Sequence, residues 1–113
     1  MKFQSIENNH YTLIKSLVEK LDSSNAQELK DLLNQLNKKN INKFIIDLSQ
    51  TKYSDSSGLS ALLIGNRLCK DTNGIFVLSG LQANVNKLIS ISQLDKVLVI
   101  KDDLNQAIDH MNL

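Results

Sequence analysis

From residue 40 onward, short apolar runs alternate with segments whose apolar residues recur at helical spacing. The runs are 44–48, 75–78 and 97–100, and each is followed by enough chain for a helix. Strands that alternate with helices are joined by right-handed crossovers and pair in parallel. This alternation therefore predicts a largely parallel sheet covered by helices.

Three helices are predicted within this part of the chain. The first should begin near Asp55 and end before Gly74, which is placed to act as a left-handed cap. Its apolar positions are Leu59, Leu62, Leu63, Leu68 and Cys69. A later helix should carry Val85, Leu88 and Ile89, and a final one Leu104, Ala107, Ile108 and Met111.

The first 40 residues predict a hairpin and one further helix. Two extended segments, 3–6 and 11–18, flank the turn-prone Asn8 and Asn9, which indicates an antiparallel pair. A helix should follow, opened by a capping box of Asn25 with Glu28 or of Ser24 with Gln27. It should end near Lys38 and Lys39, whose charges suit the carboxyl end of a helix.

These elements predict an α/β fold of one domain, residues 1–113, with an initial hairpin in a mixed, mostly parallel sheet. We expect four to five strands and about four helices, since 113 residues leave little room for more. A hydrophobic fraction of 42% is enough for one core. The core should include Leu29, Leu33, Ile45, Leu62, Val77 and Leu88.

Charge and residue types argue against several functions. Lys and Arg number 13 against 12 Asp and Glu, so no basic face for nucleic acid is indicated. Arg67 is the only arginine, which leaves few bidentate contacts for phosphates or bases. His10 and His110 have no companions at metal-ligand spacing. Glycine-rich nucleotide-binding motifs are lacking, so we expect no cofactor and no catalysis.

The single Cys69 cannot form an internal disulfide, which is typical of proteins of a reducing compartment. We interpret it as a small apolar residue of a helix, because no basic cluster lies near it to activate the thiol. No secretory leader opens the chain, and no apolar run approaches the about 20 residues that span a bilayer. A cytoplasmic protein without membrane insertion is expected.

The loop after the central strand is the best candidate for a site, because α/β sheets place sites at the carboxyl ends of strands. It ends in Asp55-Ser56-Ser57-Gly58-Leu59 at the predicted head of a helix. With Asp55 as N-cap, Ser56 takes the first helical position and its hydroxyl lies near free backbone amides. The run has two readings. It is ordinary capping, or it accepts a phosphate that the helix dipole favours.

The same run resembles the DSSGL signature of the anti-sigma factor antagonists, which belong to the STAS family. Leu21-Asp22 with Asn25-Ala26 and Leu29 is similar to the family's opening of its first helix. The likeness continues through Phe44–Leu48, Leu62-Leu63, and a last strand and helix that include Leu94, Val97 and the segment 104–108. It therefore covers nearly the whole chain.

The resemblance implies that Ser56 is phosphorylated by an anti-sigma factor serine kinase and dephosphorylated by a serine phosphatase. Unphosphorylated, the protein would sequester the kinase and so release a sigma factor. The implied partner-binding residues are Asp22, Ser23, Asp55, Ser56, Ser57, Gly58 and Leu59. Gly58 is expected to leave the helix start uncrowded for an approaching protein.

Two other functions compete with this hypothesis. A STAS subunit of a signalling or lipid or anion transport assembly would use the same fold without a sigma factor. A receiver-like domain would be phosphorylated on an aspartate, and it needs an acidic pair after its first strand to hold Mg²⁺. Residues 7–10 supply only Glu7, followed by Asn8, Asn9 and His10, which argues against it.

Overall fold

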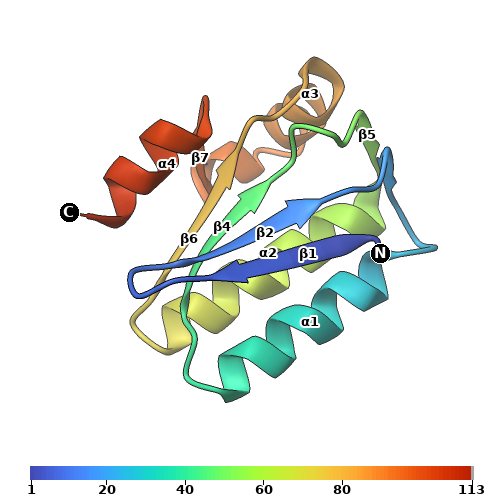
Figure 1. Ribbon diagram of the computed structural model, residues 1–113. Helices are drawn as coiled ribbons and strands as arrows, with labels where there is room; N and C mark the ends of the chain where they lie inside the picture. The colour runs from blue at the N-terminus through green and yellow to red at the C-terminus, as the bar shows by residue number, and fades with distance from the viewer. Residues whose placement is uncertain (113) are drawn as a thin grey trace.

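A mixed five-stranded sheet forms the centre of the computed structural model, which describes residues 1–112 (Figure 1). The strand order is β1-β2-β4-β6-β7. β1 and β2 form an antiparallel hairpin, and the other neighbouring strands pair in parallel. The strands are β1 (Phe3–Glu7), β2 (Thr12–Ser16), β4 (Lys43–Asp47), β6 (Ile75–Ser79) and β7 (Val99–Lys101). The predicted fold class is confirmed.

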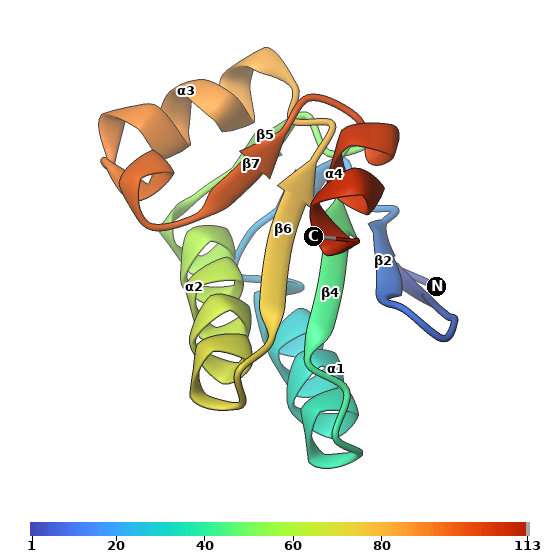
Figure 2. The ribbon, with the colours of Figure 1, turned by 90° about the vertical axis from the view of Figure 1, so that its left-hand side faces the viewer.

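Within residues 1–112, four α-helices surround the sheet. They are α1 (Ala26–Lys38), α2 (Ser56–Asp71), α3 (Ala83–Ile91) and α4 (Leu104–Met111). A short 3₁₀ helix, η1 (Leu94–Lys96), follows α3. α1 and α2 pack on one face of the sheet and α4 on the other (Figure 2). α3 lies beside β5 (Tyr53–Ser54) at one end of the sheet.

The alternating side chains of the central strands divide the core in two. On β4, Phe44 and Ile46 belong to the larger cluster under α1 and α2. Ile45 belongs to the smaller cluster under α4, with Val77 of β6. Side chains of a strand point to opposite faces, so both faces of this strand can be covered. The core prediction is confirmed for Leu29, Leu33, Ile45, Leu62 and Val77, whereas Leu88 is only partly buried.

A second, two-stranded sheet was not predicted. β3 (Lys20–Leu21) pairs in parallel with β5 (Tyr53–Ser54) at the edge of the fold where α1 and α2 begin. Two residues are too few to show an alternating pattern, so no sequence signal marked either strand. β2 ends at Ser16 rather than at residue 18, because the chain turns there toward β3.

Two helix caps differ from prediction. Asn25 is the N-cap of α1, but no side-chain capping bond forms. Its side-chain amide instead donates to the Lys20 carbonyl at 2.8 Å, and its side-chain oxygen accepts from the Asp22 amide at 3.0 Å. After α2 the left-handed residue is Asn73 (φ 59°), not Gly74. Gly74 is required for space, because a Cβ there would overlap Asn42.

The last strand also begins later than the predicted 97–100. Residues Leu94–Lys96 form the turn η1, and β7 starts only at Val99. Val97 is 46% exposed as a result. The apolar run therefore marked a turn that packs one side chain, Leu98, into the core before the strand begins.

Candidate functional site

The candidate site lies at the head of α2, where the chain arrives from β4. Asp55 is the N-cap in extended conformation, and its Oδ1 accepts a hydrogen bond from the Gly58 amide at 3.1 Å. Ser56 is the first helical residue and is exposed, whereas Ser57 is half-buried. The expected cap and the expected position of Ser56 are confirmed. Free first-turn amides and the positive end of the dipole therefore lie beside the Ser56 hydroxyl.

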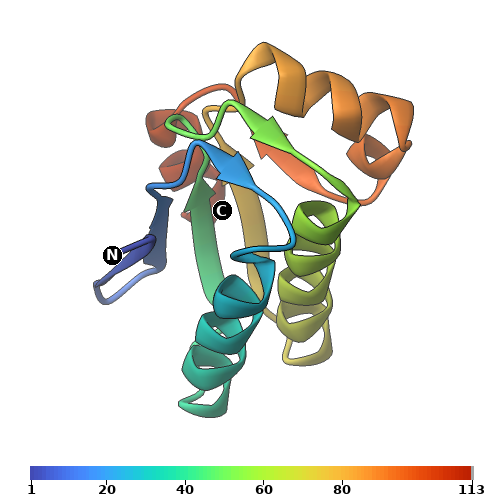
Figure 3. The same ribbon diagram turned by 90° about the vertical axis from the view of Figure 1, so that its right-hand side faces the viewer.

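The β3–β5 pair brings two distant segments of the chain together here. Leu21 pairs with Ser54, and the Asp55 amide donates to the Leu21 carbonyl at 3.3 Å. In Figure 3 the light-blue and green strands run side by side into α1 and α2. A pocket of about 440 Å³ lies beside the paired strands, and it is lined by Lys20, Asp22, Tyr53, Ser54 and Asp55. Asp22 and Asp55, both predicted as site residues, thus share one surface.

Hydrogen bonds hold the loop that precedes α1. The Ser24 amide donates to Asp22 Oδ1 at 3.0 Å, and the Ser24 hydroxyl donates to the same oxygen at 2.6 Å. These bonds stabilise the carboxylate and lower the pKa of Asp22 below its ordinary value. Ser23, which lies between Asp22 and Ser24, is exposed. The loop therefore presents a carboxylate and a hydroxyl in a fixed arrangement.

Gly58 and Leu59 lie under this surface rather than on it. Gly58 is buried, and a Cβ there would overlap Ser54 Oγ and the Leu21 carbonyl. Leu59 is 6% exposed and belongs to the larger core cluster. The expectation that Gly58 leaves room for a partner is wrong, because its missing side chain lets α2 approach β3 and β5.

Two residues that the sequence did not single out complete the site. Thr51 is fully buried, and its hydroxyl bonds to the Val18 carbonyl at 2.8 Å and to the Ser16 hydroxyl at 2.7 Å. It ties the loop to the end of β2. Tyr53 is 47% exposed and lines the pocket. In sequence, both residues look like ordinary members of a polar surface loop. No local pattern therefore indicated that Thr51 is buried or that Tyr53 lines a pocket.

Among residues 1–112, neither Cys69 nor the metal-binding residue types supply a second site. Cys69 is buried in α2, and burial raises the pKa of its thiol to about 12. Within residues 1–112, no three His, Cys, Asp or Glu side chains gather as a metal would require. None of the described helices combines the length and the apolar character needed to cross a membrane.

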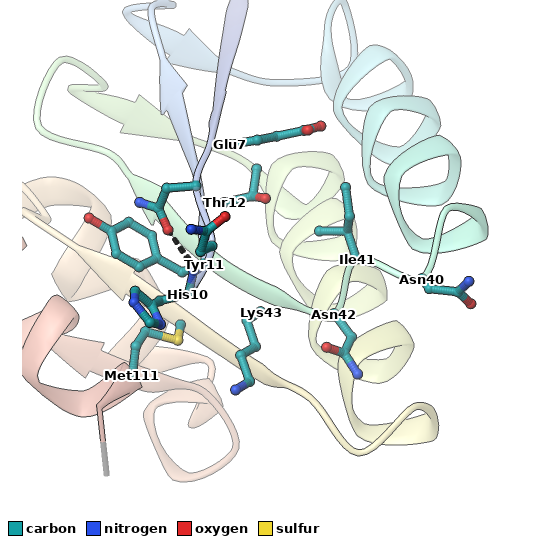
Figure 4. Close-up of a pocket in the computed structure, with 11 residues that line it drawn as sticks. Glu7, His10, Tyr11, Thr12, Asn40, Ile41, Asn42, Lys43 and Met111 are labelled. Carbon is teal, nitrogen blue, oxygen red and sulfur yellow. Dashed lines mark hydrogen bonds between the residues drawn. The ribbon is translucent and has the colours of Figure 1, made fainter.

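A separate pocket of about 370 Å³ lies at the opposite end of the sheet (Figure 4). Its walls come from the β1–β2 turn, the α1–β4 connection and the end of α4, and include Glu7, His10, Lys43 and Met111. This end holds the amino termini of the parallel strands β4 and β6. Because α/β sheets place sites at the carboxyl ends of strands, the Ser56 end is the better candidate.

The sequence matches the profile of a known protein family. The family profile for the STAS domain matches residues 4–107, and the chain belongs to this family.

Three solved structures illustrate the likeness. A candidate anti-sigma factor antagonist from Thermotoga maritima has a TM-score of 0.87 at 21% identity, over 98% of this chain and 95% of that one. The Bacillus cell fate determinant SpoIIAA in its phosphorylated form has a TM-score of 0.74 at 19% identity, over 96% and 97%. A sulfate transporter family protein from Wolinella succinogenes has a TM-score of 0.81 at 16% identity, over 95% and 88%. At these identities the likeness shows a shared fold.

Proposed function

We propose that this protein is an anti-sigma factor antagonist controlled by phosphorylation of Ser56. Unphosphorylated, it sequesters an anti-sigma factor kinase and releases a sigma factor. The observation that carries the proposal is the β3–β5 pairing, which groups exposed Ser56 with Asp22, Ser23 and Asp55 on one surface. The existence of a similar fold described as phosphorylated, SpoIIAA, supports it.

The switch acts through local charge. A phosphate adds about −1.5 to −2 charge at Ser56. The free amides at the start of α2 and the helix dipole tolerate this charge, so the fold need not rearrange. The pocket is lined by Asp22 and Asp55 against one lysine, Lys20, so the surface already carries a net negative charge. Added charge and bulk therefore repel a partner that docks on Asp22, Ser23, Asp55, Ser56 and Ser57, while Gly58 and Leu59 support these residues from beneath.

The test is phosphorylation by the cognate kinase, mapping of the phosphate by mass spectrometry, and a binding titration before and after. We expect phosphate on Ser56 and loss of kinase binding. A serine phosphatase should restore binding. Phosphate on Ser57 alone, or undiminished binding of the form phosphorylated at Ser56, would contradict the proposal.

A second candidate function is a STAS subunit of a signalling or transport assembly, which the fold shared with the Wolinella succinogenes protein favours. Purification from the native cells separates the two. Stable association with an assembly at fixed stoichiometry, without phosphate on Ser56, would favour the subunit.

For both candidate functions we propose that the chain catalyses no reaction. A nucleotide-turnover assay on wild type and Ser56→Ala would test this.

A further inference from the structure

β1 is an edge strand whose outer backbone groups are free to pair. The Leu17 amide donates to the Lys2 carbonyl at 2.9 Å, and the Asn8 amide donates to the Tyr11 carbonyl at 3.1 Å. In an antiparallel pair, residues alternate between facing the partner strand and facing away. Counting from Lys2 and Asn8, the N–H and C=O groups of Phe3, Ser5 and Glu7 point away from β2.

Most of the usual protection of an edge strand is missing within β1, whose nearest lysine is Lys2, directly before it. Residues 3–7 contain no proline and no lysine. The pairing with β2 runs without a bulge from Phe3 to Glu7. Edge strands are normally blunted by such features, because an open edge accepts another strand. β1 is therefore open to strand addition.

An acidic groove lies beside this edge. It has a volume of about 360 Å³ and lies between β1 and α1, which run side by side in Figure 1. We call it the β1 groove, and it is lined by Phe3, Glu28, Asp31, Leu32 and Gln35. Phe3 is buried and Leu32 partly buried, and they supply an apolar floor. Glu28 and Asp31 are exposed, and Glu28 forms an exposed ion pair with Lys2 at 3.9 Å, which a basic side chain of the partner would replace.

We propose that β1 and the β1 groove bind an extended segment of a partner protein whose side chains alternate between basic and apolar. Every second side chain of an added strand points toward α1. A Lys or Arg there lays its stem on Phe3 and Leu32 and brings its charge to Glu28 and Asp31. The intervening side chains meet the other face of β1, where Ile6 is 41% exposed. This surface is additional to the one around Ser56 and does not depend on the switch.

Charge argues against a second copy of this chain as the occupant. Two β1 strands paired antiparallel about Ser5 would set Glu7 of one copy opposite Phe3 of the other. That carboxylate would enter the β1 groove beside Glu28 and Asp31. Like charges in such proximity destabilise a strand pair. A basic strand avoids this repulsion and replaces it with attraction.

The test uses a peptide of alternating lysine and valine, about seven residues long, which is an ordinary strand length. Binding to the whole protein is followed by NMR. We expect amide shifts at residues 3–7 and 28–35, and none when glutamate replaces lysine. The double variant Glu28→Lys/Asp31→Lys should bind about tenfold more weakly, as expected when two exposed attractions become repulsions. The matched control Asp71→Lys/Asp109→Lys reverses two exposed charges elsewhere and should bind like wild type.

A backbone variant tests strand addition itself. Ser5→Pro removes an outward N–H that β2 does not use, and proline is tolerated at such edge positions. It should abolish binding while circular dichroism stays native. Equal binding of the lysine and glutamate peptides, shifts confined to other surfaces, or full binding by Glu28→Lys/Asp31→Lys would each overturn the proposal. Dimerisation of the free protein that Ser5→Pro prevents would also overturn it, in favour of a second copy.

Discussion

Within Asp55–Leu59, Ser56 is the proposed phosphate acceptor, and the residues around it hold the start of α2 in place. Ser56 is exposed, and its side chain forms no hydrogen bond with residues 1–112, whereas Asp55 caps α2 and Gly58 packs beneath it. Ser56→Ala should therefore keep kinase binding and lose phosphorylation. Ser56→Glu should weaken binding less than phosphate does, because a carboxylate carries less charge. The free energy of unfolding of both variants should lie within about 0.5 kcal/mol of the wild-type value.

Phosphate transfer and calorimetric titration with the cognate kinase check this prediction. Ser57→Ala is the matched control, because it changes the adjacent hydroxyl. It should still be phosphorylated. If Ser56→Ala were phosphorylated as well as wild type, the acceptor would have to be another residue.

Cys69 should be inert in the folded protein. Burial raises the pKa of its thiol to about 12, so the reactive thiolate is scarce at neutral pH. A thiol reagent should modify Cys69 only as fast as the protein opens, and rapidly in denaturant. The raised pKa means that stability falls once pH exceeds the ordinary thiol value of about 9, since the unfolded thiol then ionises and the buried one does not. Rapid native labelling would contradict this.

The pKa of Asp22 should depend on its hydrogen bonds with Ser24. Because those bonds lower the pKa of Asp22, they favour the folded loop at pH values above the ordinary 3.8. That contribution is lost as pH falls through the lowered value. Ser24→Ala should raise the pKa of Asp22 in an NMR titration of the carboxyl carbon. Ser23→Ala, next to it but without such a bond, should leave it unchanged.

At the scale of elements, the β3–β5 pair depends on the absence of a side chain at Gly58. Gly58→Ala forces a methyl group against Ser54 and the Leu21 carbonyl. Overpacking of this kind costs about 1–3 kcal/mol. We therefore expect a lower free energy of unfolding in urea and weaker kinase binding, because Asp22 directly follows β3. Ser57→Ala serves as control for stability, and its free energy of unfolding should be close to that of wild type. A neutral Gly58→Ala would show that the pair shifts freely.

The long elements were predictable from sequence and the short ones were not. α1, α2, β4 and β6 carry periodic apolar residues over enough length to be recognised. β3 and β5 consist of two residues each. Their conformation depends on backbone hydrogen bonds between distant segments, such as the one that the Lys52 amide, just before β5, donates to the Glu19 carbonyl, just before β3, at 2.8 Å. Local pattern contains no information about such partners. The last strand was predicted, but its start at residue 97 was wrong, since the left-handed Gln93 and η1 delay the strand to Val99.

The candidate site was predictable in part. The capping chemistry of Asp55 follows from residue type and position alone. The proximity of Asp22 to Asp55 came only from the family resemblance, because they lie on separate segments joined by β3 and β5. The role of Gly58 was misread, since sequence cannot tell whether a missing side chain faces solvent or a neighbouring strand.

For the whole molecule, the two-sided core sets stability. Leu62 is fully buried in the larger cluster, between α2 and the sheet. Leu62→Ala should cost about 2–5 kcal/mol, the range for a leucine that leaves a cavity. Leu63, which is only partly buried, is the natural control and should cost less. Equal losses at both positions in urea unfolding would show that α2 is oriented differently.

The buried position of Gly58 has a consequence for how such proteins diverge. Within Asp55–Leu59, Ser56 is the proposed phosphorylation site and Gly58 packs against a neighbouring strand. Selection on signalling and selection on architecture therefore act on codons only two positions apart. A descendant that abandons phosphorylation can replace Ser56 at little structural cost, but it should retain glycine two residues later. Across the lineage, loss of the serine beside a retained glycine would mark chains that changed their regulation and kept their shape.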